Sequence, residues 1–244
     1  LRAAARNQAR GFMDMALFEV GAGFHGGEPG EQHNLVSGVL IGRTGPKDVH
    51  GTSRGVDLYD AKADAEAVLA AMGAPAKVQI MRGAQEWWHP GRHGKICLGP
   101  KKVLAVFGEL HPKILREMDI KGPAVAFTIW PDEVPLPKKK TATRPALVAT
   151  DFQAVERDFA LVVDDEEEAL TLVNAAAGAD KALITDVRVF DEFIGGSLGE
   201  GKKSLAVTVR LQPTDATLKD ADIEAVSAKI VEKVAKATGG ALRG

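Results

Sequence analysis

The sequence lacks the features that mark membrane, secreted and disulfide-bonded proteins. Its single cysteine, Cys97, has no partner for an internal disulfide and no nearby Cys or His pair for a zinc site. No apolar run is long enough to span a bilayer, and the first residues contain arginines but no apolar core like that of a signal peptide. We therefore expect a soluble cytoplasmic protein, without a membrane partner, in which Cys97 is a small buried apolar residue.

The sequence also offers no convincing catalytic arrangement. No Ser-His-Asp set or carboxylate pair stands out, and the segment His89–Gly94 has two imidazoles and a guanidinium but no third metal ligand at a suitable spacing. Its Pro-Gly pair favours a turn. In Gly108–Pro112, the proline reads as the first residue of a helix and His111 as its cap. We expect no catalytic residue and no metal site.

A glycine pattern raises the question of a dinucleotide site. Gly21, Gly23 and Gly26 form G-x-G-x-x-G after a candidate strand, but the next apolar residue is Leu35, so the helix that such a site requires is missing. Without a helix N-terminus, no amides face a pyrophosphate. The pattern favours a hairpin that joins strands at 15–20 and 35–41.

Charge and proline content divide the chain. With 244 residues, 45% of them apolar, it is long enough for two ordinary domains. Residues 1–150 contain 20 Lys and Arg against 15 Asp and Glu, whereas residues 151–244 contain 11 against 18. Prolines and a lysine run at 131–145 oppose regular structure. We predict domains at 1–134 and 151–244 with a Pro/Lys-rich linker at 135–150.

The first domain is predicted to be an antiparallel sheet with few helices. Short runs rich in Val, Ile and Leu predict strands at 15–20, 35–41, 77–81, 95–98, 103–108 and 124–130. Helical spacing of apolar residues predicts a helix at 57–71, and a shorter helix follows Pro112. The first ten residues resemble the end of a helix, and since the chain does not begin with Met, we expect a fragment. The fold class is therefore α+β.

The second domain has the order β-α-β-β-α with a short last strand. Strands are predicted at 158–163, 187–193 and 204–211, and a helix whose first turn contains the five carboxylates of 164–168 is predicted to run to about Ala177. Thr217 and Asp220 resemble a capping box before a helix that stops at Gly239. This is the ferredoxin-like βαββαβ pattern.

Many short motifs, in order, resemble one family. They are Arg10-Gly11 with Asp14 and Ala16–Gly21, Asp57–Asp60 with Lys62, His89–Arg92, Gly108–Pro112, Ala154-Val155 with Arg157-Asp158, Val189–Asp191 and Gly199–Leu205. In this sequence of motifs the chain resembles the C-terminal third of the bacterial phenylalanyl-tRNA synthetase beta subunit, over nearly its whole length.

The resemblance implies a role for each domain. Residues 1–134 would be a class II synthetase-like core that has lost the catalytic residues and packs on the alpha subunit, in a heterotetramer of two alpha and two beta chains. In this family the alpha subunit uses ATP and Mg²⁺ to charge tRNA(Phe), so no cofactor is expected in this chain, and DNA is not a partner. His89–Arg92 and Gly108–Pro112 would be structural turns. Residues 151–244 would be a ferredoxin-fold anticodon-binding domain.

The resemblance also selects site residues for tRNA binding. Asp191, Phe193, Ser204 and Arg243 stand at the matching positions, and Phe193 replaces a frequent tyrosine while keeping a ring that can stack on a base. The cations Lys202, Lys203 and Arg210 lie on or beside the same strands, which predicts an acidic helix side and a mildly basic open face.

Strand alternation conflicts with this assignment. It places Asp191 and Phe193 on one face with Val187 and Val189, and a β-bulge near Phe190 would resolve the conflict.

Two other functions stay open from the residues alone. Ferredoxin-like domains also bind small regulatory molecules such as amino acids, because a fold does not determine a function. An oxidoreductase built on Gly21–Gly26 would have to retain a nicotinamide nucleotide.

Overall fold

The structure is a computed structural model that describes residues 1–46, 49, 51, 53–83, 86–136, 146 and 149–243. The chain divides into two compact units, unit 1 at Leu1–Thr143 and unit 2 at Arg144–Gly244. Each unit is α+β with antiparallel strand pairs, which confirms the predicted fold class. Most of the linker predicted at 135–150 lies outside the described residues.

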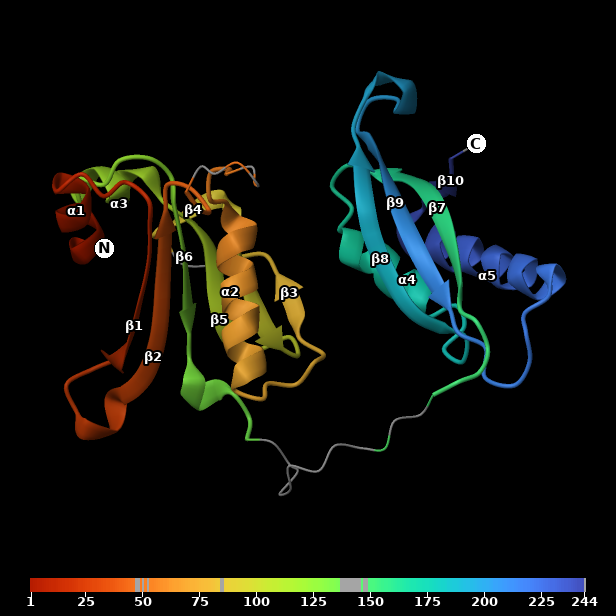
Figure 1. The fold of residues 1–244 in the computed structure, drawn as a ribbon, viewed down its shortest axis with the longest axis horizontal. Coiled ribbons are helices and arrows are strands. Elements are labelled where there is room, and N and C mark those ends of the chain that lie inside the picture. The colour runs from red at the N-terminus through yellow and green to blue at the C-terminus, as the bar shows by residue number, and fades with distance from the viewer. Residues whose placement is uncertain are drawn as a thin grey trace. The chain divides into compact units, whose positions relative to one another are not determined.

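Unit 1 contains a six-stranded sheet in the order β1-β2-β6-β5-β4-β3 (Figure 1). Its strands are β1 Met15–Phe24, β2 Gln32–Ile41, β3 Gln79–Met81, β4 Trp88–Leu98, β5 Lys102–Leu110 and β6 Ala124–Ile129. Its helices are α1 Arg2–Ala9, α2 Leu58–Ala71 and α3 Pro112–Glu117. All six predicted strands are present. Most are longer than predicted, because cross-strand pairing continues beyond the residues whose alternation identified each strand.

Helix α2 covers one face of this sheet (Figure 1). Its Ala61, Ala65 and Leu69 are buried against side chains of β5 and β6 that include Phe107 and Phe127. Small alanines let the helix approach the strands closely, while Leu69 and the rings fill the remaining volume. Helix α2 contacts β2, β5 and β6, so the edge strand β1 lies beyond the main contacts of the helix.

The opposite face of the sheet is covered at one end. Helices α1 and α3 supply Ala4 and Leu115 to a second apolar cluster with Ile41 and Ala126 of the sheet. The side chain of Gln8 on α1 bonds both backbone groups of Lys121, which joins α1 to the segment after α3. As predicted, His111 caps α3, because its Nδ1 accepts the amide of Lys113 at 3.1 Å.

The glycine pattern lies in a hairpin, as expected. Gly21 and Gly23 belong to β1, and the chain then makes a single 3-10 turn at Pro29–Glu31 before β2 begins. A Cβ at Gly26 would meet the Glu31 carboxylate at 2.0 Å, so a larger residue there would displace the Glu31 side chain, which accepts the amide of Glu28. Among the described residues after Gly26, the first α-helix is α2, which begins at Leu58, so no described α-helix starts where a dinucleotide site would need one.

The turns predicted at His89–Arg92 and Gly108–Pro112 are wrong. Residues 89–94 belong to β4, whose register with β5 shifts between Trp88 and His93, so the extra residues form an irregularity within a strand. Gly108 is paired in β5, and Arg92 donates to both carboxylate oxygens of Glu109. This ion pair holds the pKa of Glu109 below its usual range. Pro90 and Gly91 thus lie within β4, in the irregular stretch between the pairs Trp88–Leu110 and His93–Gly108.

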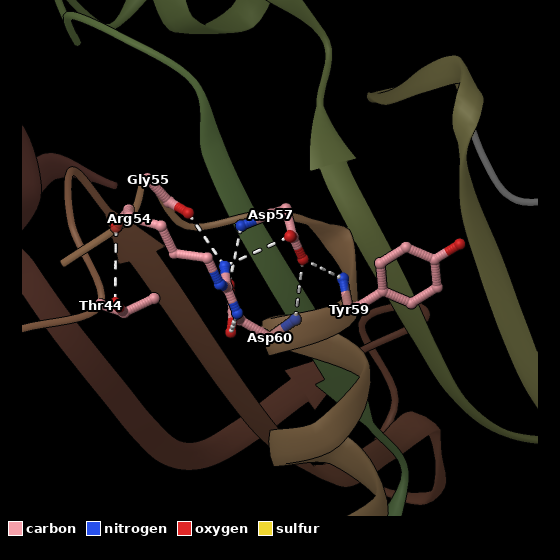
Figure 2. A network of polar contacts seen from close by, with 6 residues as sticks. All are labelled: Thr44, Arg54, Gly55, Asp57, Tyr59 and Asp60. Atoms are coloured by element: carbon pink, nitrogen blue, oxygen red, sulfur yellow. Dashed lines mark hydrogen bonds and ion pairs between the residues drawn. The ribbon is translucent and has the colours of Figure 1, made fainter. Parts of the chain in front are cut away.

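A polar network secures the start of α2 (Figure 2). Asp57 is the N-cap and accepts the amides of Tyr59 and Asp60, while the Asp60 carboxylate accepts the amide of Asp57 at 2.8 Å. Arg54 donates to both oxygens of Asp60 at 2.7 Å and to Asp57 at 3.2 Å. The hydrogen bond from Arg54 is the main reason why the pKa of Asp60 is lowered. The loop before α2 is thus tied to the first turn of the helix.

Unit 2 is a four-stranded sheet with two helices, in the order β10-β7-β9-β8. Its elements are β7 Val155–Asp164, α4 Ala169–Ala177, β8 Ile184–Phe193, β9 Lys202–Leu211, α5 Asp220–Thr238 and β10 Ala241–Leu242. Leu205, Val207 and Val209 of β9 are buried in one cluster with Leu172 of α4 and Ile230 of α5. Both helices therefore pack on the same face, and the other face of the sheet is open. The predicted β-α-β-β-α-β order is confirmed.

Both helix starts in unit 2 differ from the predictions. Asp164 pairs with Lys202 in the ladder, so β7 runs one residue further than predicted and only Glu168 reaches the N-cap of α4. Helix α5 begins at Asp220 rather than after Thr217, because the Asp222 carboxylate accepts the amide of Lys219 at 3.0 Å. Gly239 ends α5 in the left-handed conformation, at φ 67°, as its position predicts.

None of the helices among the described residues has the length and apolar character that crossing a membrane requires.

The network at the start of α2 predicts a pH-dependent stability. Asp60→Asn removes the ion pair with Arg54 and weakens the capping box, so the free energy of unfolding of unit 1 should fall by about 1 kcal/mol at pH 7. Because the folded pKa of Asp60 is lowered, its contribution is present above the unfolded pKa and is lost as the pH falls through the folded pKa. The variant should therefore lose less stability than the original chain between pH 5 and pH 2.

Tryptophan fluorescence during urea unfolding measures this effect, since Trp87, Trp88 and Trp130 all belong to unit 1. Glu66→Gln is the control: it removes an exposed ion pair with Lys62 on the same helix and should change stability by a few tenths of a kcal/mol. Equal losses in the two variants at every pH would contradict the prediction.

Candidate nucleic-acid interface

A β-bulge at Phe190 determines the candidate site in unit 2. Val189 pairs with Val207 and Asp191 pairs with Ala206, so Phe190 has no partner on β9. Val207 is buried against the helices, whereas Ala206 belongs to the open face. Paired residues of an antiparallel ladder point to the same side. The extra residue therefore moves Asp191 and Phe193 to the open face and resolves the alternation conflict.

Phe193, Ser204 and Arg243 are brought together on this open face. Phe193 pairs with Ser204, and the Arg243 guanidinium carbon lies 5.2 Å from the centre of the Phe193 ring, within cation–π range. The backbone amide of Arg243 bonds the carbonyl of Ala160 at 2.7 Å, which fixes the end of the chain beside β7. Ser204 is only 3% exposed, while Phe193 is 41% exposed and available to a flat ligand.

The tip of the Phe193 ring is held against the backbone that follows β8. A Cβ added at Gly195 would come within 2.7 Å of the ring atom Cζ. Glycine at this position therefore lets the ring lie close to the chain, with Arg243 over it. Asp191 stands two residues earlier and is exposed, so a carboxylate acceptor and an aromatic ring lie on one side of the edge strand.

The three predicted cations are placed differently. Lys202 lies on the open face and bonds Asp164 at 2.5 Å, and Arg210 lies 3.7 Å from Glu156 on the same face. Lys203 pairs with the buried Val163 and so lies on the helix side, where its ammonium group is 3.3 Å from Glu192. The structure thus brings Lys202 and Arg210, but not Lys203, to the open face.

The open face is not basic, which contradicts the predicted charge distribution. The register places these charged residues on it: Glu156, Asp158, Asp164, Asp186, Asp191, Lys202, Arg188, Arg210 and Arg243. Five carboxylates thus face four cations, and cross-strand ion pairs occupy two of the cations. The surface offers few free positive charges for phosphates.

Arg188 also lies on the open face, although it was not among the predicted site residues. This residue pairs with Thr208 on the open face, where the Thr208 hydroxyl also donates to Asp158 at 2.6 Å. The sequence indicates this position, because a charged residue between Val187 and Val189 is typical of the solvent side of a strand.

The described part of unit 1 contains no group of three or more His, Cys, Asp or Glu residues arranged to hold a metal ion. Cys97 is fully buried, and burial raises the pKa of its thiol, which opposes thiolate chemistry. The adjacent tryptophans divide as expected, with Trp88 in the core and Trp87 exposed.

Two protein families match the chain. The Phenylalanyl tRNA synthetase beta chain CLM domain matches residues 1–130, and the Ferredoxin-fold anticodon binding domain matches residues 150–243.

Full-length relatives match along the whole chain. A phenylalanine–tRNA ligase beta subunit of Ruegeria pomeroyi is 79% identical over 244 residues, which are 100% of this chain and 31% of the relative. Proteins of the same name are 71% identical in Cereibacter sphaeroides and 52% identical in Rhodospirillum rubrum, again over 100% of this chain and over 31% and 30% of the relatives. The chain spans about a third of the length of these relatives.

Proposed function

The chain belongs to the phenylalanyl-tRNA synthetase beta-chain family, and from this membership we propose that it supplies tRNA binding and subunit assembly to a phenylalanine–tRNA ligase. We assign residues 1–134 to assembly with an alpha subunit, 135–150 to a linker and 151–244 to anticodon binding. The grouping of Phe193, Ser204 and Arg243 on an open sheet face is the observation that carries the tRNA-binding proposal.

The chemistry of charging belongs elsewhere in the proposed enzyme. In a cytoplasmic assembly of two alpha and two beta chains, the alpha subunit uses ATP and Mg²⁺ to activate phenylalanine and transfers it to tRNA(Phe). This chain holds no cofactor in the proposal. The buried Cys97 and the hairpin at Gly21–Gly26 support this division, because neither provides a reactive group or a phosphate cradle.

Base stacking is the proposed basis of anticodon binding. The Arg243 guanidinium occupies one face of the Phe193 ring, so a base that stacks there displaces it and frees a cation beside the base. Asp191 can accept hydrogen bonds from amino or imino groups of a base, and the Ser204 hydroxyl can donate or accept one. Because few phosphate contacts are available on this face, its contribution should depend weakly on salt.

Phe193→Ala in the alpha–beta complex tests this proposal. Loss of one stacked base should cost on the order of 1–3 kcal/mol, which is roughly a 5- to 150-fold increase in the Michaelis constant for tRNA(Phe). Steady-state charging at several tRNA concentrations measures it. Phe193→Tyr keeps the ring and should stay near the original value.

Two controls separate stacking from charge. Phe190→Ala removes an exposed ring at the bulge, where β9 offers no partner, and Lys203→Ala removes a cation on the helix side. Because Lys203 lies on the helix side and pairs with Glu192, Lys203→Ala should cost less than Phe193→Ala. An unchanged Michaelis constant in Phe193→Ala beside a strong increase in Lys203→Ala would overturn the stacking proposal.

An apolar surface along β1 supports the assembly proposal. Phe18 and Val20 pair with β2 and lie on the face of the sheet that α2 covers at other strands. Phe18, Val20 and Phe24 are 67–81% exposed. A groove of about 380 Å³ lies between β1 and α2 and is lined by Phe18, Val36 and Val68. Asp64 lines the same groove, and burial raises the pKa of its carboxyl. An apolar partner surface carrying one cation would fit here.

This surface predicts self-association of the chain without its partner. An edge strand with exposed large apolar side chains promotes association, so light scattering should show oligomers at high concentration. The double variant Phe18→Ser with Val20→Ser should shift the chain toward monomer, whereas Tyr59→Ser, which removes an exposed ring at the start of α2, should not. A stable monomer at high concentration in the original chain would contradict the assembly surface.

The division of chemistry makes a further prediction. The purified chain alone should show no ATP–pyrophosphate exchange in the presence of phenylalanine, because the proposal places activation on the alpha subunit. Adding the alpha subunit with full-length beta chain is the positive control. Exchange above background from the chain alone would place a catalytic site in it.

A further inference from the structure

Half of the sheet face opposite α2 in unit 1 is left open as a hollow. Lys95, Val106 and Thr128 are register partners across β4, β5 and β6, so they share this face. Val106 also belongs to the cluster formed with α1 and α3, and Val103 and Trp130 pack against that cluster, which therefore forms the apolar side of the hollow. The open half is hollowed to about 870 Å³, within the usual size of ligand sites. We call it the lysine hollow, and it is lined by His25, Lys95, Lys101, Lys102, Trp130 and Glu133, with Gly83, Val103 and Val106.

The charge of the lysine hollow is strongly one-sided. Three lysines line it, against one carboxylate, Glu133, which already pairs with Lys102 at 3.2 Å. Within the part of the chain that the structure describes, neither Lys95 nor Lys101 forms an ion pair. Two ammonium groups are thus available to an anionic ligand, and a third is shared with an exposed carboxylate.

The floor of the lysine hollow is apolar and includes an aromatic ring. Val103 and Val106 come from β5, and the backbone amide of Trp130 bonds the carbonyl of Leu104 at 3.0 Å, which fixes the tryptophan beside that strand. An aromatic ring and three lysines that line one hollow suit a ligand that carries both phosphates and planar groups, because any nucleobase can stack on an aromatic side chain.

The arrangement favours a polymer backbone over a free nucleotide. The lining residues come from strands and turns, so no α-helix N-terminus directs amides at a phosphate chain. Lysines on flexible stems act as separate point charges, which suits phosphates spaced along a strand. In addition, the open face of unit 2 has five carboxylates and four cations, so phosphate contacts there are few.

We propose that the lysine hollow is a second RNA-binding site, in which Lys95, Lys101 and Lys102 contact backbone phosphates and Trp130 packs against a base. The proposal goes beyond anticodon binding and uses residues of the other unit, so it stands or falls independently of Phe193.

Salt-dependent binding of a tRNA(Phe) transcript to the 244-residue chain tests the proposal. The triple variant Lys95→Gln, Lys101→Gln and Lys102→Gln keeps the length of the side chains and removes three charges. The slope of log affinity against log salt should become shallower by about 2, since each phosphate contact with a single strand contributes about 0.7. The dissociation constant at 0.1 M salt should rise at least tenfold.

A matched control removes the same charge elsewhere on unit 1. Lys77→Gln, Lys113→Gln and Lys121→Gln replace three exposed lysines that do not line the lysine hollow. Equal losses of affinity in the two triple variants would overturn the proposal, because binding would then depend on net charge alone. Displacement of the tRNA by 1 mM ATP or tripolyphosphate at constant ionic strength would overturn it too, since the hollow would then be a site for small phosphates.

The Phe193→Ala background separates this inference from the proposed function. In Phe193→Ala, the three lysine substitutions should still lower the salt slope by about 2. An effect of the lysines without an effect of Phe193 would support the hollow and refute the stacking proposal, and the reverse result would refute the hollow alone.

Discussion

In an antiparallel ladder, successive side chains face opposite sides of the sheet, and the candidate interface of unit 2 depends on one departure from this rule. Phe190 has no partner on β9, so the residues after it change sides. Without that extra residue, Phe193 would point toward the helices and Glu192 toward the open face. The extra residue thus places the Phe193 ring on the exposed side of the edge strand, beside Ser204. The contact with Arg243 follows from this placement.

The same two-sided geometry gives unit 1 surfaces of different chemistry. Helix α2 covers the middle of one face and leaves the apolar side chains of β1 exposed. On the other face, the cluster with α1 and α3 leaves the lysine hollow open. An apolar surface and a cationic one therefore lie on opposite faces of a single sheet, so a protein partner and a polyanion need not compete for the same residues.

The sequence was sufficient for features that depend on local patterns. Alternation and apolar spacing identified the strands and α2, and the lack of apolar residues after Gly26 correctly indicated a hairpin. Features that depend on which residues pair between strands were harder to predict from the sequence. Pro90-Gly91 favours a turn in isolation but lies in β4, between the pairs Trp88–Leu110 and His93–Gly108. Five carboxylates at 164–168 favour a helix start, although the ladder with Lys202 extends β7 to Asp164. The position of the bulge was expected only because the family resemblance required Asp191 and Phe193 on the open face, whereas alternation placed them with Val187 and Val189.

Charge shows most clearly why register matters for function. A count along residues 151–244 gives an acidic domain, and separating helix starts from strands suggested a basic sheet face. The ladder instead sets Glu156 and Asp186 beside Arg210, and Asp164 beside Lys202, so the cations of the strands are balanced where they stand. A face balanced in this way attracts RNA weakly at long range but leaves stacking on Phe193 intact, because stacking does not depend on net charge. Under the two proposals, base selection and phosphate attraction are therefore assigned to different units of the chain. Each can then change without loss of the other.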